Sequence, residues 1–347
     1  MRNTKETWMY ILKRVLLMIF TFLVIFVISF FLIRLLPLDP STAPGKDTES
    51  FYMMQVALGR MYKGTDGEYH KTPIIEQLFM FVKGLFVPAT YEANEEIHTA
   101  SRWGYSWVIS WLATPDSLLL KGLPPTILIN IYSIILSVPI GLGLGIYMAL
   151  NKNKWQDHVL SIVVMLLISV PSFVDAFLLQ YLFAFKLGWL PSVRADFKGS
   201  WFTPEMFSSM ILPVISMSFG SIAGYSRYTR AELTEVLTSD FMLLARTKGL
   251  NRAQATVRHA FRNSLVPIFP MILGEIISIL SGSIIIENIF SVNGVGGLFL
   301  QSIQMKDYDV FQFVSMFYIL IGLVGGLVVD ISYGLVDPRI RMGGGKQ

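Results

Sequence analysis

The stretch from Val15 to Ile33, "VLLMIFTFLVIFVISFFLI", decides the class of fold, because almost all of its side chains are apolar. A helix needs about 20 predominantly apolar residues to cross the roughly 30 Å of hydrocarbon in a bilayer. Lys13, Arg14 and Arg34 bracket the run, and no small-residue cleavage site follows it. We therefore expect a retained transmembrane helix rather than a signal peptide.

The composition of the whole chain agrees with a membrane protein. Of its 347 residues 53% are hydrophobic and only 15% are charged, with a mean hydropathy of +0.55, which leaves too little polar surface to cover a soluble globule of this size. The chain has no cysteine, which excludes disulfides, thiolate metal sites and a cysteine nucleophile. Four histidines without H-E-x-x-H spacing give no reason to expect a zinc site. We expect neither a catalytic constellation nor a bound metal or cofactor.

Five further apolar runs have about the length of a membrane-crossing helix. They cover about 124–150, 158–185, 207–225, 265–289 and 310–335. The predicted fold is an all-α polytopic membrane protein with six transmembrane helices. Cytoplasmic loops are enriched in Lys and Arg. The side that would hold both termini carries sixteen of these residues, against four in the short loops opposite, so we expect both termini and the loop 227–262 to be cytoplasmic.

The long segment 38–121 is set aside from that count and is predicted to be a small extracellular insert, with ten acidic and seven basic residues. Within it, apolar residues recur at helical intervals: Ile75, Leu78, Phe79, Val82 and Phe86. Three tryptophans cluster farther on: Trp103, Trp107 and Trp111. Two interpretations stay open here. The aromatic residues either pack the insert and sit at the lipid interface, or they form a docking surface for an external partner.

The cytoplasmic stretch from Ser239 to Leu250, "SDFMLLARTKGL", differs from the apolar runs because it is basic and half polar. Asp240 is predicted to cap a helix, and Gly249 to end it in a left-handed conformation. Asn251 and Gln254 resemble a capping box that opens a second helix. On the first helix one face carries Phe241, Leu244, Ala245 and Lys248. This helix–break–helix loop suits either a cleft on a soluble partner or contact with anionic lipid.

The longer stretch "FMLLARTKGLNRAQATVRHAFRNSLVPI" resembles the EAA loop of binding-protein-dependent ABC import permeases. The strong matches are Ala245, Gly249, Leu265 and Pro267. Leu243 and Leu244 replace the Glu and first Ala of the broad pattern, and the run Ala245 to Leu250 is similar to the dipeptide and oligopeptide branch. Further motifs follow in the order of that branch: "LLPLDP" (35–40), "SVPSF" (169–173), "KLGWLP" (186–191), "ENIFSVNGVGGL" (287–298) and "VVDISYGLVDPRIR" (328–341).

This resemblance implies a type I ABC importer permease in a bacterial cytoplasmic membrane. Its parts would be a tail and first helix (1–37), the insert (38–121), a permease core (122–341) and a C-terminal tail (342–347). Its partners would be a homologous second permease subunit, two cytoplasmic ATPases that use ATP and Mg, and an external peptide-binding protein, with no nucleic acid. The chain itself has no G-x-x-x-x-G-K-[ST] motif, so we expect no ATPase activity of its own. The residues expected to couple it to the ATPases are Asp240, Phe241, Leu244, Ala245, Arg246, Lys248 and Gly249.

Polar residues inside the apolar runs are candidates for the translocation path, because ionisable groups within a membrane are costly and often functional. These are Asn130, Asp175, Gln180, Glu275, Ser278 and Ser281. For Asp175 and Glu275 hydrogen bonds between helices are the alternative. Asp330 is expected instead to cap its helix or to pair with Arg339. A candidate outer gate follows the fifth run, with a compact turn as the alternative: Glu287, Gly294, Gly296 and Gly297.

The predicted cargo is an oligopeptide or dipeptide, because the matching branch carries peptides. Relatives in that family also carry nickel complexes and glutathione, so these cargoes stay open. An ion-coupled secondary transporter would also have several spans and a few buried carboxylates. The sequence shows no clear inverted repeat, and such a transporter has no need of the helix–break–helix loop.

Overall fold

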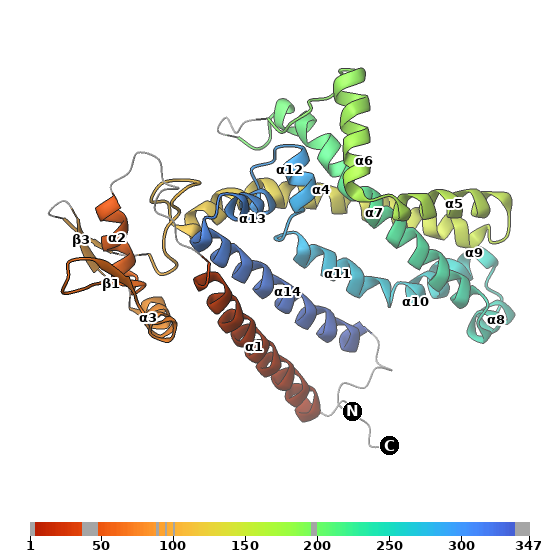
Figure 1. Ribbon diagram of the computed structural model, residues 1–347. Coiled ribbons are helices and arrows are strands. Elements are labelled where there is room, and N and C mark those ends of the chain that lie inside the picture. Colours follow the sequence, from red (N-terminus) through yellow and green to blue (C-terminus); the bar gives the residue numbers. More distant parts are fainter. Residues whose placement is uncertain are drawn as a thin grey trace. The chain divides into compact units, whose positions relative to one another are not determined.

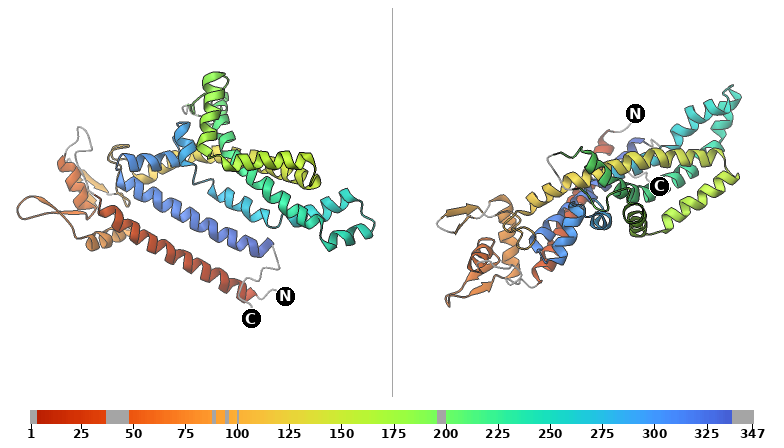
Figure 2. Two further views of the ribbon diagram at one scale, coloured as in Figure 1. Left: turned by 45° about the vertical axis from the view of Figure 1, so that its right-hand side comes forward. Right: turned by 90° about the horizontal axis from the view of Figure 1, so that it is seen from above.

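A computed structural model describes residues 4–36, 48–87, 90–93, 96–99, 101–195 and 200–336. The described chain is mostly helical, as predicted (Figures 1 and 2). It divides into two compact units. One comprises Met1–Leu16, Pro124–Gly296 and Ile321–Gln347, and the other comprises Leu17–Leu123 and Gly297–Leu320. Three of the four longest helices in the described chain contribute residues to both units, and each unit is described by itself below.

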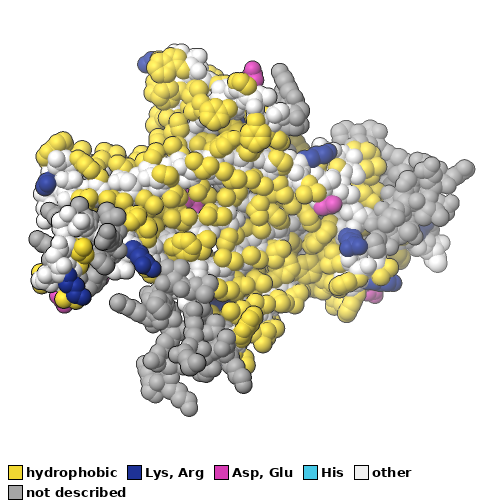
Figure 3. All heavy atoms as spheres, turned by 180° about the vertical axis from the view of Figure 1, so that it is seen from behind, with side chains coloured by type: hydrophobic (Ala, Val, Ile, Leu, Met, Phe, Trp, Pro, Cys, Tyr) yellow, Lys and Arg dark blue, Asp and Glu magenta, His cyan; other side chains and the backbone are white. Residues whose placement is uncertain are grey.

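Four helices in the described chain are long and apolar enough to cross a membrane, and they match the first, second, fourth and sixth predicted spans. They are α1 (Thr4–Arg34), α4 (Pro115–Leu150), α7 (Pro204–Leu237) and α14 (Tyr308–Val336). Many of their large hydrophobic side chains are exposed, and hydrophobic side chains cover most of the surface visible in Figure 3. Such a surface is expected where lipid rather than water is the solvent.

The third predicted span is not one helix. It consists of α5 (Trp155–Ser169) and α6 (Ser172–Leu179), which continues as the π-helical turn η2 (Gln180–Lys186). The two halves are bent by 99°. Val170 and Pro171 between them have extended backbone, because proline lacks an amide hydrogen and disfavours helical conformation in the residue before it. The prediction of an unbroken helix over 158–185 is therefore wrong.

The fifth predicted span, 265–289, is also broken. Its longest part is α11 (Ile268–Ser278), which at about 1.5 Å per residue reaches only about half the thickness of the hydrocarbon. Gly282 then has φ +62°, and Ser283 caps α12 (Ile284–Ile289) by accepting a hydrogen bond from the Ile286 amide at 3.3 Å. The chain thus leaves the helical path after α11 and starts a new short helix.

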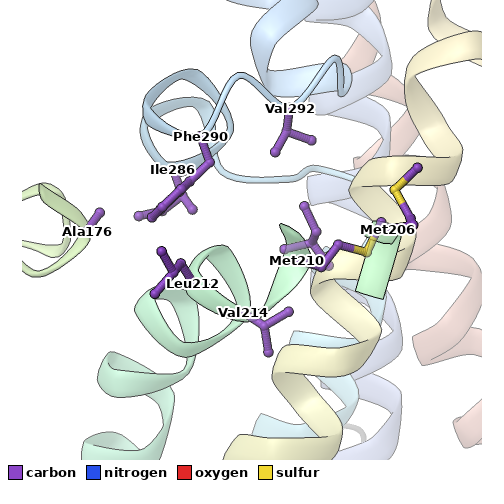
Figure 4. Packing of buried hydrophobic residues seen from close by; sticks show 9 residues of the cluster. Ala176, Met206, Met210, Leu212, Val214, Ile286, Phe290 and Val292 are labelled. Atoms are coloured by element: carbon purple, nitrogen blue, oxygen red, sulfur yellow. The ribbon is translucent and has the colours of Figure 1, made fainter. Parts of the chain in front are cut away.

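The first unit is built around α7. Leu212 of α7 lies beside Ile286 and Phe290 of the α12 segment, and Met210 of α7 belongs to the same buried cluster (Figure 4). Farther along α7, its backbone approaches α4 closely: a Cβ added to Gly145 would lie 2.5 Å from Thr229 Cβ and 2.7 Å from the Ser226 carbonyl oxygen. Small residues allow such close contact between transmembrane helices. Side chains larger than hydrogen at Gly145 would force α4 and α7 apart.

The second unit contains the insert and includes two β-hairpins that the sequence did not predict. Helix α2 (Thr48–Ala57) precedes the hairpin of β1 (Met61–Lys63) and β2 (Tyr69–Lys71), in which Tyr62 pairs with His70. Helix α3 (Ile74–Phe86) comes next. A second antiparallel hairpin follows, formed by β3 (Thr90–Ala93) and β4 (Glu96–Thr99). Phe51, Met54, Tyr105 and Trp107 form one buried cluster, with Trp111 packed against it, which agrees with a packing role for these tryptophans.

Two buried carboxylates, Asp307 just before α14 and Asp309 in its first turn, tie the insert to the chain that follows α13 (Val295–Gln304). Asp309 accepts hydrogen bonds from both terminal nitrogens of Arg60, at 2.6 and 3.0 Å, and both side chains are almost fully buried. Asp307 accepts a hydrogen bond from Ser106 Oγ at 2.6 Å and bonds from three successive amides, those of residues 107, 108 and 109. Burial raises the pKa of the Asp307 carboxyl, and these hydrogen bonds oppose that rise. The insert is therefore fixed to the beginning of α14.

Candidate functional site

The predicted helix–break–helix loop is present and follows α7. Helix α8 (Asp240–Thr247) is followed by Gly249 with φ +90°, and α9 (Arg252–Ala255) comes next. The Leu250 amide donates to the Ala245 carbonyl at 3.4 Å, a bond that spans the left-handed residue in a Schellman motif. At the start of α9, Asn251 Oδ1 accepts from the Gln254 amide at 2.8 Å, and Gln254 Oε1 accepts from the Asn251 amide at 3.2 Å. The predicted capping box is confirmed.

The start of α8 differs by one residue from the prediction. The Ser239 carbonyl accepts the first backbone hydrogen bonds of the helix, from the amides of Met242 and Leu243. Ser239 therefore holds the cap position, and Asp240 is the first helical residue. A negative charge there still favours the helix, because the N-terminal turn carries a partial positive charge.

The side of α8 that is buried also differs from the prediction. Met242 and Ala245 are buried against Leu233 of α7 and Ala149 of α4, in a cluster that includes Ala255 and Ala260. Ala245 thus packs within its own chain and is not available to a partner. The apolar side chains that α8 presents outward are Leu243 and Leu244, which are 64% and 56% exposed. Lys248 and Gly249 are exposed as well, whereas the side chains of Phe241 and Arg246 lie outside the described residues.

A partly buried ion pair joins α7 to the beginning of α5, and sequence reasoning missed it. Arg230 Nε and Nη2 donate to the two carboxylate oxygens of Asp157, at 2.6 and 2.8 Å, and the Asp157 side chain is fully buried. The Asn153 amide donates to the same carboxylate at 3.0 Å. Such two-pronged contacts fix orientation as well as distance. With the alanine cluster, this pair joins α4, α5, α7 and α8 at the end of the unit that carries the loop.

Among the path candidates, Glu275 bonds to another helix. Its carboxylate accepts hydrogen bonds from Ser221 Oγ at 2.6 Å and from the Tyr225 hydroxyl, both on α7. Gln180 is buried and donates to the carbonyls of Ser192 and Ile289, at 2.7 and 3.2 Å. For Glu275 these contacts are the alternative that the sequence left open. A role in the path stays a prediction for both residues.

The remaining path candidates are bonded locally or partly exposed. Asn130 Nδ2 donates to the Thr126 carbonyl at 2.7 Å, and Ser278 Oγ donates to the Gly274 carbonyl at 2.9 Å, each within its own helix. Asp175 lies in the first turn of α6 and is half-buried. Ser281 lies in the break between α11 and α12. The four residues lie on different segments: α4, α6, α11 and the break after α11.

The candidate outer gate is a compact structure around Glu287. Thr126 Oγ1 donates to Glu287 Oε1 at 2.8 Å and accepts from the Val295 amide at 2.9 Å. A Cβ added to Gly294 or Gly296 would lie 2.5 or 2.9 Å from Glu287 Oε2. Both glycines therefore leave the room that this buried carboxylate occupies. Gly297 follows in the first turn of α13. The sequence missed Thr126, 161 residues away.

Asp330 forms an ion pair with Arg14 at 3.0 Å, and both side chains are partly exposed. The expected partner, Arg339, lies outside the described residues. Within the described ranges no group of three or more His, Asp or Glu residues is placed to hold a metal ion.

Comparison with known proteins gives one family and several long relatives. Residues 141–342 match the family described as binding-protein-dependent transport system inner membrane component. The chain is 31% identical over 334 residues to the dipeptide transport system permease protein DppB of Bacillus subtilis (strain 168), covering 96% of this chain and 98% of that one. It is 30% identical over 335 residues to the glutathione transport system permease protein GsiC of Salmonella choleraesuis (strain SC-B67), with coverage of 96% and 98%.

Among solved structures, an amino acid ABC transporter crystallised with histidines is similar, with 17% identity and a TM-score of 0.49, covering 63% of this chain and 94% of that one. The family match covers more than half of the sequence and includes the α8–α9 loop, and the full-length relatives carry permease names. As its loop motif predicted, the chain belongs to the family of binding-protein-dependent transport system inner membrane components, in the DppB branch of the ABC importer permeases.

Proposed function

We propose that this chain is the channel-forming subunit of an ATP-driven ABC importer that takes up oligopeptides or dipeptides delivered by an external solute-binding protein. In this proposal a homologous permease subunit completes the channel, and two cytoplasmic ATPase subunits bind ATP and Mg and carry out hydrolysis. The chain spans the bacterial cytoplasmic membrane with both termini and the α8–α9 loop in the cytoplasm, and its 38–121 insert lies outside.

The observation that carries the proposal is the α8–Gly249–α9 elbow. Helix α8 exposes Leu243 and Leu244 while Met242 and Ala245 anchor it to α7 and α4. A short helix with an apolar knob and a neighbouring cation, Lys248, fits an apolar groove with an acidic rim on a partner protein. The exposed leucines would supply the buried contact that the sequence analysis assigned to Ala245.

The packing of α8 supports transmission of force into the channel. Movement of α8 would carry α7 and α4 with it, because Met242 and Ala245 lie in one cluster with Leu233 and Ala149. It would also carry the start of α5 through the Arg230–Asp157 pair. Closely packed interiors transmit such displacement because they deform little. Closure of the ATPases would thus rearrange several helices together.

The peptide cargo is supported by the relatives rather than by a pocket. The DppB and GsiC proteins named above are a dipeptide and a glutathione transport permease, and both cargoes are short peptide-like molecules. Glutathione is accordingly the second candidate cargo. Peptides carry charged termini and many amide groups, which polar side chains such as Asn130, Asp175, Gln180, Glu275, Ser278 and Ser281 would meet along a water-filled path.

Site-specific crosslinking tests the proposal directly, because the chain has no cysteine of its own. Single cysteines at Leu243→Cys and Leu244→Cys, treated with a short bifunctional reagent in intact cells, should capture an ATPase subunit that mass spectrometry identifies by its nucleotide-binding motifs. Glu68→Cys, in the exposed turn of the first hairpin, is the matched control and should not capture it. Capture of no ATPase from either leucine position, in a chain that is inserted and labelled normally, would refute the coupling role.

A further inference from the structure

Helix α3 exposes an apolar face that its own unit leaves open. Ile75, Phe79, Val82 and Phe86 recur at intervals of four, three and four residues, which places them on one side of the helix. Their side chains are 63%, 72%, 39% and 79% exposed. Exposure of such an apolar face to water is unfavourable, so we expect either lipid or another protein to cover it.

The opposite face of α3 is packed against two membrane-spanning helices. The Phe81 ring lies 5.8 Å from the Phe26 ring and 5.5 Å from the Phe30 ring of α1, measured between centroids. These aromatic residues share a buried cluster with Met316 of α14. Trp103 extends the contact, because its ring lies 5.4 Å from Phe81 and 5.1 Å from Phe313 of α14.

These contacts give the depth of α3 in the bilayer. At about 1.5 Å per residue, Phe30 and Phe26 lie about 6 and 12 Å along α1 from its end at Arg34. The apolar segment of α1, Trp8–Arg34, has 27 residues and is therefore about 40 Å long. The hydrocarbon layer is roughly 30 Å thick, so a centred helix extends about 5 Å beyond it at each end. Phe81 therefore packs between about 1 and 7 Å inside the hydrocarbon boundary. Helices that lie in a membrane interface insert about 5–10 Å.

The second spanning helix gives the same depth independently. Met316 lies about 12 Å along α14 from its first residue, Tyr308. The height of the insert is fixed at that end by the buried Arg60–Asp309 pair and by the amides bound to Asp307. A helix attached at this level cannot rise out of the interface without breaking those contacts.

Helix α3 also crosses the spanning helix rather than running beside it. In Figure 1 α3 is seen nearly end-on, whereas α1 runs lengthwise across the view. A helix that crosses a membrane-spanning helix at this depth lies along the membrane surface. On α1, Leu23 and Val27, close in sequence to Phe26 and Phe30, are exposed apolar residues as well.

We propose that α3 is an interfacial membrane helix whose Ile75, Phe79, Val82 and Phe86 side chains insert among the lipid acyl chains of the leaflet at the Arg34 end of α1. The stripe beside this face carries Glu76 and Lys83, both exposed, which reach toward the headgroups while their stems stay in the apolar layer. The helix holds the insert to the bilayer surface next to the channel. Of the two roles that the sequence left open for these residues, the contacts favour lipid over an external protein.

Spin labels test this proposal, again because the chain lacks cysteine. The full chain, purified with the subunits that accompany it, is placed in nanodiscs of phosphatidylcholine and phosphatidylglycerol with a nitroxide at Phe79→Cys. Collision with oxygen, which concentrates in lipid, is compared with collision with a water-soluble nickel chelate. The label at Phe79→Cys should collide more often with oxygen than with the chelate, and so should a label at Phe20→Cys on the exposed face of α1. A label at Glu68→Cys in the hairpin turn should collide more often with the chelate.

Two further labels measure the orientation of α3. Ile75→Cys and Phe86→Cys lie eleven residues apart, or about 16 Å along the helix, and should report the same depth if α3 lies along the membrane surface. If the chelate collides with the label at Phe79→Cys as often as with the label at Glu68→Cys, the face is exposed to water and the proposal is overturned. Low collision with both reagents would overturn it in favour of a protein cover. Neither readout depends on transport, so the result is independent of the proposed function.

Discussion

Helices α3 and α8 are both short and amphipathic, and both attach to longer helices through a buried stripe, but they differ in what surrounds that stripe. Aromatic rings hold α3: Phe81 packs against Phe26 and Phe30. Aliphatic side chains, several of them alanines, hold α8: Ala245 and Met242 share a buried cluster with Leu233, Ala149, Ala255 and Ala260. Outward, α3 presents a row of Ile75, Phe79, Val82 and Phe86, whereas the exposed apolar side chains among those described on α8 are Leu243 and Leu244.

In our two proposals, this difference separates α3, which faces lipid, from α8, which faces a protein. Ala245 of α8 and Ala149 of α4 lie in one buried cluster. Small side chains allow close contact between helices, which favours a rigid connection that can transmit movement. Bulky rings at a membrane boundary instead fill space between helices that lipid would otherwise occupy. The amphipathic pattern of a short helix is the same in both cases. The long helices to which it attaches, and the depth of that attachment, decide its partner.

The largest effect is expected from breaking the attachment of the insert. Asp309→Ala leaves the buried Arg60 guanidinium without its carboxylate, which typically costs about 3–5 kcal/mol. Thermal unfolding of the detergent-solubilised chain should show this loss, and α3 should become sensitive to protease, while crosslinking through Leu244→Cys is retained. The double variant Arg60→Met with Asp309→Leu removes both charges and should recover much of the stability. An unchanged melting curve for Asp309→Ala would show that this pair does not hold α3 in place.

A smaller effect is expected from loosening α8. Met242→Ala removes the larger anchor of that helix, which is only 4% exposed, and should cost about 2 kcal/mol of local stability. Hydrogen exchange of the α8 amides should become faster and peptide uptake should fall, while the spin label at Phe79 is unaffected. Thr247→Ala, an exposed position on the same helix, is the control. Equal exchange rates in Met242→Ala and the parent chain would contradict the anchoring role.

Much of the fold could be predicted because it depends on lengths of apolar sequence. The four long helices needed only the thickness of a bilayer and the count of apolar residues. The two broken spans needed more, since Pro171 and Gly282 were visible in the sequence but the apolar runs continued past them. Hydropathy averages over a window, whereas a single backbone conformation is enough to end a helix.

The site was predictable only where its signals are local. Gly249 and the Asn251–Gln254 box depend on neighbouring residues, and both have the expected conformation. The rotation of α8 depends instead on distant Ala149 and Leu233, so helical spacing alone put Ala245 on the wrong face. Partners such as Thr126 for Glu287 are set by the folded chain and had no local signal.

The next effect concerns the left-handed residue that ends α8. Gly249→Val places a β-branched side chain at φ +90°, which should cost about 1–3 kcal/mol. The elbow should then adopt another path, so that peptide uptake and substrate-stimulated ATP turnover fall while membrane insertion is retained. Gly249→Asn is the matched control, because asparagine tolerates this conformation better. Normal uptake and ATP turnover in Gly249→Val would refute a coupling role for the elbow, and α8 would no longer contrast with α3 in function.

The two variants with the smallest expected effect on stability distinguish most clearly between the exposed face of α3 and that of α8. Phe79→Ser and Leu243→Ser each replace an exposed apolar side chain, so in detergent each should change the free energy of unfolding by less than about 0.5 kcal/mol. Their consequences in the membrane should differ. Phe79→Ser should leave recovery of ATPase subunits unchanged in pull-downs, because the acyl chains around α3 adapt to a smaller side chain. Leu243→Ser should reduce that recovery, because a groove on a protein loses its apolar contact and cannot refill it. If Phe79→Ser lowered the recovery of a protein partner as much as Leu243→Ser does, the apolar row of α3 would be a protein contact, and depth along α1 would not be sufficient to identify a lipid-facing helix.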